Sequence, residues 1–255
     1  FDTAELATSR AAQQIIDRAA AQPDCVLGLA TGGTMPPVYR HLTDAHLAGS
    51  VSFASVTTFN LDEYVGLAPD HPCSYHHFMA QELFDATDFD RSRTHIPIGD
   101  AQDPEAEAKR YDAMIQAAGS IDLQLLGIGT NGHIGFNEPT SSFGSRTRIK
   151  TLTKATRSAN QRYFSDGEEP PRYAITVGIQ TILESRDIVL LETGASKASA
   201  VATMIEGALS ASCPATALQL HPSTTIILDQ DAASQLKLRE YYFQVHPNGQ
   251  ETPIV

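Results

Sequence analysis

The sequence predicts an α/β fold built on an open, mostly parallel sheet, and two observations carry this prediction. Short apolar segments alternate with longer segments of helical periodicity along most of the 255 residues, and strands that alternate with helices form a parallel sheet covered on both faces. Glycine and polar residues follow several of the apolar segments, at the strand ends where such sheets bind ligands. A hydrophobic content of 42% is enough for a sizeable core.

The individual elements follow from local patterns taken in chain order. Residues 4–21 carry apolar side chains at helical spacing, and residues 25–30 form a short apolar strand. Pro36 and Pro37 suit the first turn of a helix that runs to residue 48, because the N–H that proline lacks has no partner there. The other expected helices lie within 71–84 and at 103–118, 155–164, 179–184, 194–209 and 232–242; the other expected strands are 55–60, the first part of 121–139, 172–177, 187–192, 218–221 and 225–228.

The chain is organised around the stretch IDLQLLGIGTNGHIGFNEP at residues 121–139. Its apolar first half is typical of a buried parallel strand, and its glycines let the backbone approach a ligand closely. A surface turn with a stray histidine is the alternative interpretation. A carboxylate and two amides lie within eight residues together with the histidine, which favours a functional site made of Asn131, His133, Asn137 and Glu138.

Three further strand ends carry candidate ligand groups. The Thr-Gly-Gly-Thr turn at 31–34 stands between a strand and a helix start, where free amides and the helix dipole bind phosphate; a tight turn without a ligand is the alternative. Asp62 follows the strand 55–60, and a helix-capping acid is its alternative. Lys197 lies in a first helical turn, where the dipole disfavours a cation that has no anion to meet, although an exposed lysine is the commoner case.

The charge of the chain limits its partners. Eighteen basic and 30 acidic residues give a formal net charge of −12, and so acidic a surface repels phosphate backbones, which argues against nucleic acid. An anionic substrate must therefore be held by a few placed basic groups and backbone amides. A basic cluster of Arg146, Arg148 and Lys150 stands out at 146–153, although charges on a solvated strand face need no function.

Cysteine usage and hydropathy indicate a location. Cys25, Cys73 and Cys213 show neither disulfide nor metal spacing, so we expect a reducing cytoplasm and no metal site. No apolar run reaches the roughly 18 residues of a membrane span, and no signal peptide precedes the first helix. The abrupt opening at Phe1 and Asp2 leaves room for a short strand ahead of this sequence.

The groups at the strand ends suit chemistry on a sugar phosphate. A carboxylate can take a proton from the carbon next to a carbonyl once the sugar ring is open, and histidine can move the proton that opening requires, because its ordinary pKa lies near neutrality. No Cys or Ser stands in a nucleophile pattern, and no dinucleotide fingerprint occurs. The residues alone predict a cofactor-free isomerase or hydrolase of a phosphorylated sugar.

At these residues the chain resembles the glucosamine-6-phosphate deaminase family, from about residue 4 to residue 238. Six motifs carry the resemblance in combination: LGLATGGT (27–34), TFNLDEYVGL (58–67), HPCSYHHFM (71–79), GIGTNGHIGFNEP (127–139), SRTRIKTLT (145–153) and LQLHP (218–222). The resemblance implies a single domain over 1–255 with a Rossmann-like three-layer fold. It also implies aldose–ketose isomerisation coupled to deamination, in which glucosamine 6-phosphate and water give fructose 6-phosphate and ammonia without a cofactor.

The resemblance further implies roles for individual residues. Asp62 would shuttle a proton from C2 to C1, His133 would assist ring opening, and Glu138 would support His133. The phosphate would be held by Thr31, Gly32, Gly33, Thr34, Arg162 and Lys197, and residues 152–172 correspond to the mobile lid of the family. Many members carry aspartate where this chain has Asn131; an amide can orient the His133 ring but cannot stabilise imidazolium by charge.

Other readings stay open at this point. The 6-phosphogluconolactonases share the fold and a similar Gly-His loop, but they usually show Asp-Glu-Arg where this chain has Asp62-Glu63-Tyr64. A deaminase of galactosamine 6-phosphate would differ only in the configuration of its sugar. A non-catalytic sugar-phosphate sensor is the third reading, and the intact Asp62, His133 and Glu138 speak against it.

Regulation is also implied by the resemblance. In hexameric, allosteric members an activator site for N-acetylglucosamine 6-phosphate lies between subunits, and its residues correspond to Ser141, Arg148, Lys150 and Thr151. Two cations spaced by two residues on a strand point the same way and can bind a phosphate together. We therefore expect a homo-oligomer, with a hexamer as its form. Inter-subunit salt bridges of the basic strand are the alternative, and the tail after Leu238 departs from the regulated members.

Overall fold

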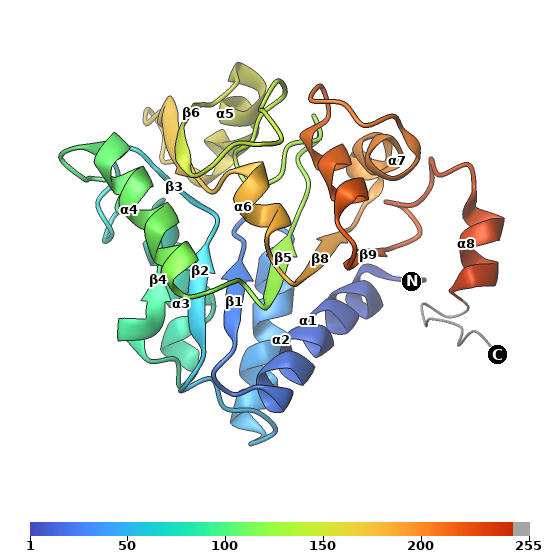
Figure 1. Cartoon of the computed structure of the whole chain (residues 1–255), viewed down its shortest axis with the longest axis horizontal. Coiled ribbons are helices and arrows are strands. Elements are labelled where there is room, and N and C mark those ends of the chain that lie inside the picture. Colours follow the sequence, from blue (N-terminus) through green and yellow to red (C-terminus); the bar gives the residue numbers. More distant parts are fainter. Residues whose placement is uncertain (247–255) are drawn as a thin grey trace.

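A computed structural model of the chain describes residues 1–246, which fold around a six-stranded sheet. The strand order is β4-β2-β1-β5-β8-β9, and every neighbouring pair is parallel. The prediction of an open, mostly parallel α/β sheet in a three-layer fold is confirmed (Figure 1). The strands are β1 (Val26–Leu29), β2 (Thr57–Asn60), β4 (Thr94–His95), β5 (Leu123–Leu126), β8 (Asp187–Glu192) and β9 (Thr224–Leu228).

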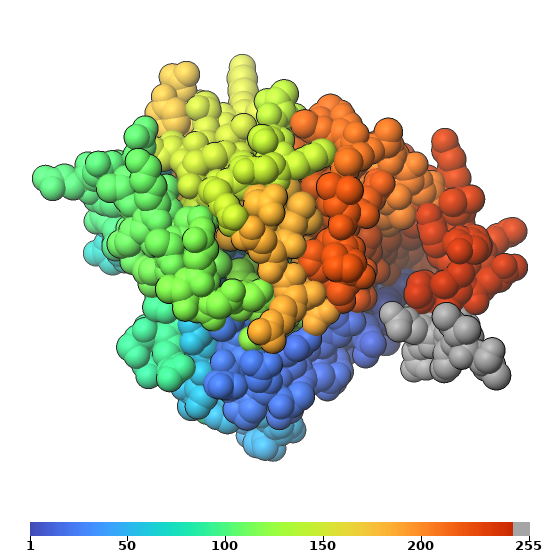
Figure 2. Space-filling model, in the orientation of Figure 1, coloured from blue at the N-terminus to red at the C-terminus, as the bar shows by residue number. Residues whose placement is uncertain are grey.

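Helices cover both faces of this sheet. Right-handed crossovers place α2 and α3 on one face and α4, α6 and α7 on the other, and α1 packs beside α2. Figure 2 shows side chains of α4, α6 and the 3₁₀ helix η5 covering most of one face. The helices are α1 (Ala4–Ala21), α2 (Met35–Leu47), α3 (Tyr75–Glu82), α4 (Pro104–Ala117), α5 (Lys154–Asn160), α6 (Ile179–Leu183), α7 (Ala198–Glu206) and α8 (Arg239–Val245), with η5 at Pro214–Leu220.

Local capping explains where several helices begin. The Ser74 hydroxyl accepts the N–H of His77 at the start of α3, and the Asp103 carboxylate accepts two N–H groups at the start of α4. A side chain that accepts these otherwise unpaired N–H groups stabilises the first turn. Among residues 1–246, no helix is both long enough and apolar enough to cross a membrane.

A second, antiparallel sheet lies beyond the carboxyl ends of the main strands, at the top of Figure 1. Its order is β3 (Asp62–Tyr64), β7 (Tyr173–Thr176) and β6 (Arg148–Thr151). Leu61 links the two sheets, because its N–H donates to Leu29 of the main sheet and its carbonyl accepts the N–H of Val177. The link turns the chain so that Asp62 begins a new strand directly above the end of β2.

Two predicted elements are wrong. Residues 218–220 belong to η5 and not to a strand, residue 221 follows that helix, and the edge of the main sheet is formed by β9. The helix expected at 232–242 forms only as α8, from Arg239. Residues 232–235 are turns, and the Glu206 carboxylate accepts the N–H groups of Lys237 and Leu238.

Candidate active site

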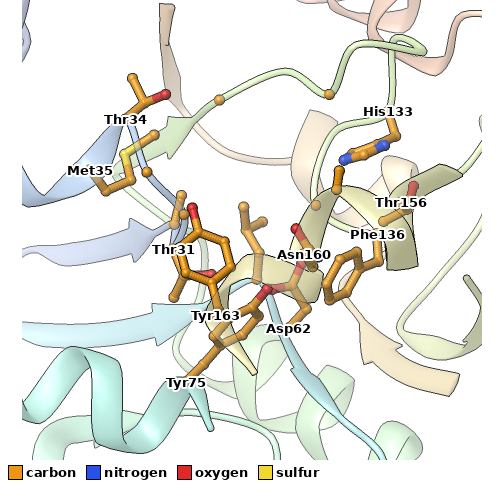
Figure 3. Close-up of a pocket in the computed structure, with 18 of the residues that line it drawn as sticks. Thr31, Thr34, Met35, Asp62, Tyr75, His133, Phe136, Thr156, Asn160 and Tyr163 are labelled. Atoms are coloured by element: carbon orange, nitrogen blue, oxygen red, sulfur yellow. The ribbon is translucent and has the colours of Figure 1, made fainter. Parts of the chain in front are cut away.

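A cavity of about 540 Å³ opens at the carboxyl ends of the main strands and beneath α5. Figure 3 shows Asp62 on its floor, His133 and Thr34 at opposite sides, and Asn160 and Tyr163 reaching in from the segment that covers it. The cavity brings together most of the residues that the sequence singled out: Thr31, Gly32, Gly33, Thr34, Asp62, Asn131, His133, Arg162 and Lys197. Glu138 lies behind Asn131 and does not line the cavity.

Asp62 begins β3 of the second sheet and is almost completely buried. It pairs with Thr176 of β7 and is 5% exposed. Gly135 has a φ of +53°, and a Cβ there would lie 3.3 Å from Asp62 Oδ2. Glycine is therefore favoured at 135 both by its backbone conformation and by the space that the carboxylate takes.

Burial decides the protonation of Asp62. Loss of water raises the pKa of the Asp62 carboxyl to about 8, and the Glu63 carboxylate adds to this, while a hydrogen bond from the Phe136 N–H works against it. A carboxyl with a pKa near the working pH can both accept and return a proton. Asp62 thus has the chemistry of a general base that also acts as an acid.

Asn131 and His133 form a hydrogen-bonded pair with fixed roles. Asn131 Nδ2 donates to Glu138 Oε2 at 2.8 Å, so its Oδ1 is the atom that faces His133 Nδ1 at 2.7 Å. Because Oδ1 can only accept, Nδ1 of the histidine carries the proton and Nε2 is left to take up a second one. The ring is therefore oriented for proton transfer on its Nε2 side.

Glu138 is buried yet ionised. It is 1% exposed, and it accepts the N–H of Thr153 at 3.0 Å and the Thr153 hydroxyl at 3.2 Å. Burial works to raise the pKa of Glu138, but the nearby His133 ring, the Thr156 hydroxyl and the Thr153 N–H outweigh it and hold the pKa at about 2. Its Oε2 lies 3.6 Å from His133 Nδ1, so the carboxylate can stabilise a protonated histidine.

The Thr-Gly-Gly-Thr turn runs from β1 into α2, as the sequence predicts. The covering segment brings two side chains against this turn, since a Cβ on Gly33 would lie 3.1 Å from the Tyr163 hydroxyl and 3.5 Å from Arg162 Nη2. The Arg162 guanidinium stacks on the Tyr163 ring at 4.8 Å. Backbone N–H groups, a helix start and an arginine together are suited to binding a phosphate.

Lys197 reaches the same end of the cavity from the segment after β8. It lies in a 3₁₀ turn, η4 (Ala195–Lys197), and α7 begins only at Ala198. Its ammonium group donates to the Ile128 carbonyl and lies 3.4 Å from Glu192 Oε2. An exposed lysine is thereby ruled out, because the cation is turned inward.

Sequence reasoning missed Glu192 and the part played by Glu63. Glu192 is a carboxylate at the end of the apolar strand 187–192, the same pattern that drew attention to Asp62. Glu63 accepts the N–H groups of Tyr75 and His76 and so fixes the start of α3. Its adjacency to Asp62 was visible, but nothing in the spacing separates the two acidic residues by role.

Contacts of the covering segment hold it over the cavity. Asn160 Nδ2 donates to the Tyr64 hydroxyl at 2.9 Å, and the Cys73 thiol donates to the Tyr163 carbonyl at 3.1 Å. The helix expected at 155–164 ends at Asn160 and continues as a 3₁₀ turn, η3 (Gln161–Tyr163). Within residues 1–246, no group of three or more His, Cys, Asp or Glu side chains could hold a metal ion.

The basic strand lies outside the cavity. Arg148 Nη1 donates to Asn137 Oδ1 at 2.9 Å, and burial lowers the pKa of its guanidinium. Burial also lowers the pKa of Lys150, and the charge of Arg148 adds to that effect. Ser141 is buried, with no hydrogen-bond partner for its hydroxyl among the described residues, whereas Thr151 is exposed.

The chain is similar in sequence to known proteins along most of its length. Residues 2–227 match the family profile of glucosamine-6-phosphate isomerases/6-phosphogluconolactonase. The glucosamine-6-phosphate deaminase of Shewanella loihica is 53% identical over 98% of this chain and 92% of its own length. That of Marinomonas sp. is 55% identical over 91% of this chain and 88% of its own length.

Solved structures give the same picture. A glucosamine-6-phosphate deaminase described as monomeric is 49% identical, with a TM-score of 0.90 over 92% of this chain and 97% of its own. The 6-phosphogluconolactonase of Trypanosoma cruzi reaches a TM-score of 0.76 over 93% of this chain and 95% of its own at 18% identity. So distant a likeness shows a shared fold and nothing finer.

Proposed function

Because this chain belongs to the family of glucosamine-6-phosphate isomerases and 6-phosphogluconolactonases, we propose that it converts glucosamine 6-phosphate and water to fructose 6-phosphate and ammonia. The observation that carries the proposal is one cavity with Asp62 on its floor, the Asn131–His133 pair at one side and the 31–34 turn at the other. The deaminases match at about half of all positions, whereas the lactonase of Trypanosoma cruzi matches at 18%.

Ring opening is assigned to His133. Its Nε2 takes the proton of the C1 hydroxyl, and the imidazolium then protonates the ring oxygen as the C1–O5 bond breaks, which leaves an open-chain aldehyde. Asn131 keeps the ring oriented, and Glu138 stabilises the transient positive charge from 3.6 Å. In this assignment Asn131 and Glu138 act through the histidine.

Asp62 carries the isomerisation. Its carboxylate takes the proton from C2, the electron pair forms a C1–C2 double bond, and the aldehyde oxygen becomes a hydroxyl by taking a proton from the ammonium group on C2. An equivalent proton, supplied by water, leaves with ammonia in the final hydrolysis. The Asp62 carboxyl then returns its proton to C1, which leaves an iminium group at C2. Water adds to C2 and ammonia leaves, so that the ketone of fructose 6-phosphate forms and Asp62 is again ionised.

The phosphate would lie at the other end of the cavity. We assign it to the N–H groups of Thr31, Gly32, Gly33 and Thr34, with Arg162 and Lys197 supplying charge, because these groups converge on one side of the cavity. Residues 152–172 would form a lid that opens to admit substrate, because Asn160 and Tyr163 of this segment lie over the cavity and contact its walls. A closed lid excludes water from the proton transfers.

One experiment tests the function. Purified protein is incubated with glucosamine 6-phosphate, and released ammonia and fructose 6-phosphate are measured, with galactosamine 6-phosphate and 6-phosphogluconolactone as competing substrates. We expect ammonia from the gluco-configured sugar and none from an Asp62→Asn variant that still binds substrate. Lactone hydrolysis without ammonia would assign the chain to the hydrolases, and binding without turnover would make it a sensor.

We also propose a second phosphate site at a subunit interface, built from Ser141, Arg148, Lys150 and Thr151. The two cations share the outer strand of the second sheet, and in a chain of net charge −12 such a pair can attract an anion. Light scattering tests assembly, and a monomer, as described for the relative at 49% identity, would end the hexamer. Superimposable titrations with and without N-acetylglucosamine 6-phosphate would end the activator role.

The reducing cytoplasm is the location that we propose for this enzyme. Cys25, Cys73 and Cys213 are free thiols, and Cys25 and Cys213 are buried. Thiols persist in a reducing compartment. Fractionation of the source cells with detection of the protein in each fraction would test the location.

A further inference from the structure

A buried carboxylate lies inside the end of the cavity that we assign to phosphate. Glu192 ends β8, is 2% exposed and lines the cavity together with Thr34 and Lys197. Its Oε1 accepts the Thr34 hydroxyl at 3.2 Å. Its Oε2 accepts the Ile128 N–H at 3.1 Å and lies 3.4 Å from Lys197 Nζ. A negative charge opposes the binding of phosphate, so Glu192 should lower the affinity of the cavity for phosphate.

The partners of Glu192 are donors that a phosphate oxygen would also accept from: a hydroxyl, a backbone N–H and an ammonium group. They come from three separate segments, namely the 31–34 turn, the loop after β5 and η4. We propose that Glu192 is a resident counter-anion, which satisfies these donors in the free enzyme and weakens the binding of phosphate alone. The inference rests on the proposed function, because it takes a sugar phosphate as the ligand.

The electrostatic argument concerns Lys197. An ammonium group that is turned into a cavity and has no partner would attract small anions. Glu192 supplies that partner at 3.4 Å, so an arriving phosphate finds Lys197 already paired and is repelled by the carboxylate beside it. Lys197 therefore attracts phosphate less than an unpaired ammonium group would, and Arg162 and the backbone N–H groups of the turn supply the rest of the attraction. The repulsion acts on every phosphate ligand alike, so the sugar must supply the remaining binding energy of the substrate.

The consequence is a low affinity for phosphate alone. Inorganic phosphate has no sugar to engage the far side of the cavity, where His133 and Asp62 lie (Figure 3), so it competes poorly with the sugar phosphate. Substrate and product both carry phosphate, so the carboxylate weakens them equally. Loss of its charge should therefore lower both KM for substrate and the inhibition constant of fructose 6-phosphate, which is the pattern of uniform binding.

The test measures the Kd of inorganic phosphate by calorimetry at fixed pH and ionic strength. Glu192→Gln and Glu192→Val remove the charge, and we expect each to bind phosphate at least about fivefold more tightly, since one like charge nearby costs this much or more at low dielectric. Glu192→Asp keeps the charge and should gain nothing. Glu184→Gln removes an exposed carboxylate that pairs with Arg146, and it is the matched control, with an unchanged Kd.

Two results would overturn the inference. Equal or weaker phosphate binding in the neutral variants would mean that Glu192 only joins three segments of the chain through its contacts. Failure of both neutral variants to fold, seen in thermal melts, would do the same. Phosphate binding is measured without turnover, so the two proposals fail separately: wild-type protein that releases no ammonia ends the proposed function, whereas active wild-type protein with no gain in the neutral variants ends only the role of Glu192.

Discussion

Asp62 should make kcat/KM for glucosamine 6-phosphate rise with pH up to about 8. Burial raises the pKa of this carboxyl from 3.8 to about 8, which corresponds to roughly 6 kcal/mol of preference for the neutral form. Only the ionised form can take the C2 proton. The ionised fraction is about one tenth at pH 7 and about one hundredth at pH 6, so the rate should fall about tenfold for each pH unit below 8.

The assay follows ammonia release from pH 5.5 to 9.5 at several substrate concentrations, so that kcat and kcat/KM are obtained separately. The limb in kcat/KM reports the free enzyme, and the limb in kcat reports the complex. A cationic amino sugar beside the carboxylate favours its ionised form, so the limb in kcat should lie at lower pH. The ionisations of the substrate itself are measured by NMR and subtracted.

A profile of kcat/KM that is flat between pH 6 and 9 would refute this reasoning. It would mean that Asp62 is ionised throughout this pH range and that water or hydrogen-bond donors offset the effect of burial on its pKa. Asp62→Asn is the control, because it removes the titrating group and should reduce kcat by at least about a hundredfold. If the residual activity of the variant kept the same pH dependence, the titrating group would be another residue.

Three further substitutions test the other parts of the site. Lys197→Ala should raise KM roughly tenfold or more with little change in kcat, because phosphate contacts contribute uniform binding; an unchanged KM would remove Lys197 from the phosphate site. Gly135→Ala should cost about 1 kcal/mol for its φ of +53° and should lower kcat by displacing Asp62, so a variant with normal kcat would show that the carboxylate tolerates the contact. Glu138→Gln should reduce the free energy of unfolding by about 3 kcal/mol at neutral pH. The ordinary pKa of Glu138 is 4.5 and its folded pKa is about 2, so the difference from wild type should be full above pH 4.5 and close as pH falls toward 2; a difference that did not close would assign it to packing.

The central strands of the main sheet could be read from the sequence because they are buried on both faces, whereas β4, an edge strand of two residues, could not. The strands at 26–29, 123–126 and 187–192 are short apolar runs between helical segments, and parallel strands in this class read in that way. The strand β3 could not be read, because three residues are too few for any period. The strand predicted at 218–221 is wrong for a related reason. Leu218 is buried within a 3₁₀ helix, and a short apolar run does not distinguish a buried strand from a buried helical turn.

The location of the candidate site could be predicted because several of its residues directly follow strands. Asp62, His133 and Thr34 each follow a strand of one parallel sheet, so they had to meet at its carboxyl edge. The distances within the site could not be predicted, because they depend on contacts between segments far apart in the chain. Glu138 and Thr153 meet through the second sheet, and Lys197 turns inward only because Glu192 and the Ile128 carbonyl receive it.

The two buried carboxylates of the site divide the proton chemistry between them. Asp62 and Glu138 are both nearly inaccessible to water, yet burial raises the pKa of Asp62 to about 8, while donated hydrogen bonds hold that of Glu138 at about 2. Residues whose environments separate their pKa values in this way are suited to different roles. Asp62 can exchange a proton with a carbon atom near neutral pH, whereas Glu138 cannot be protonated there and serves as a fixed charge for His133. Exchange of the two environments would abolish both roles, and this is why the donors Thr153 and Thr156 belong to the site.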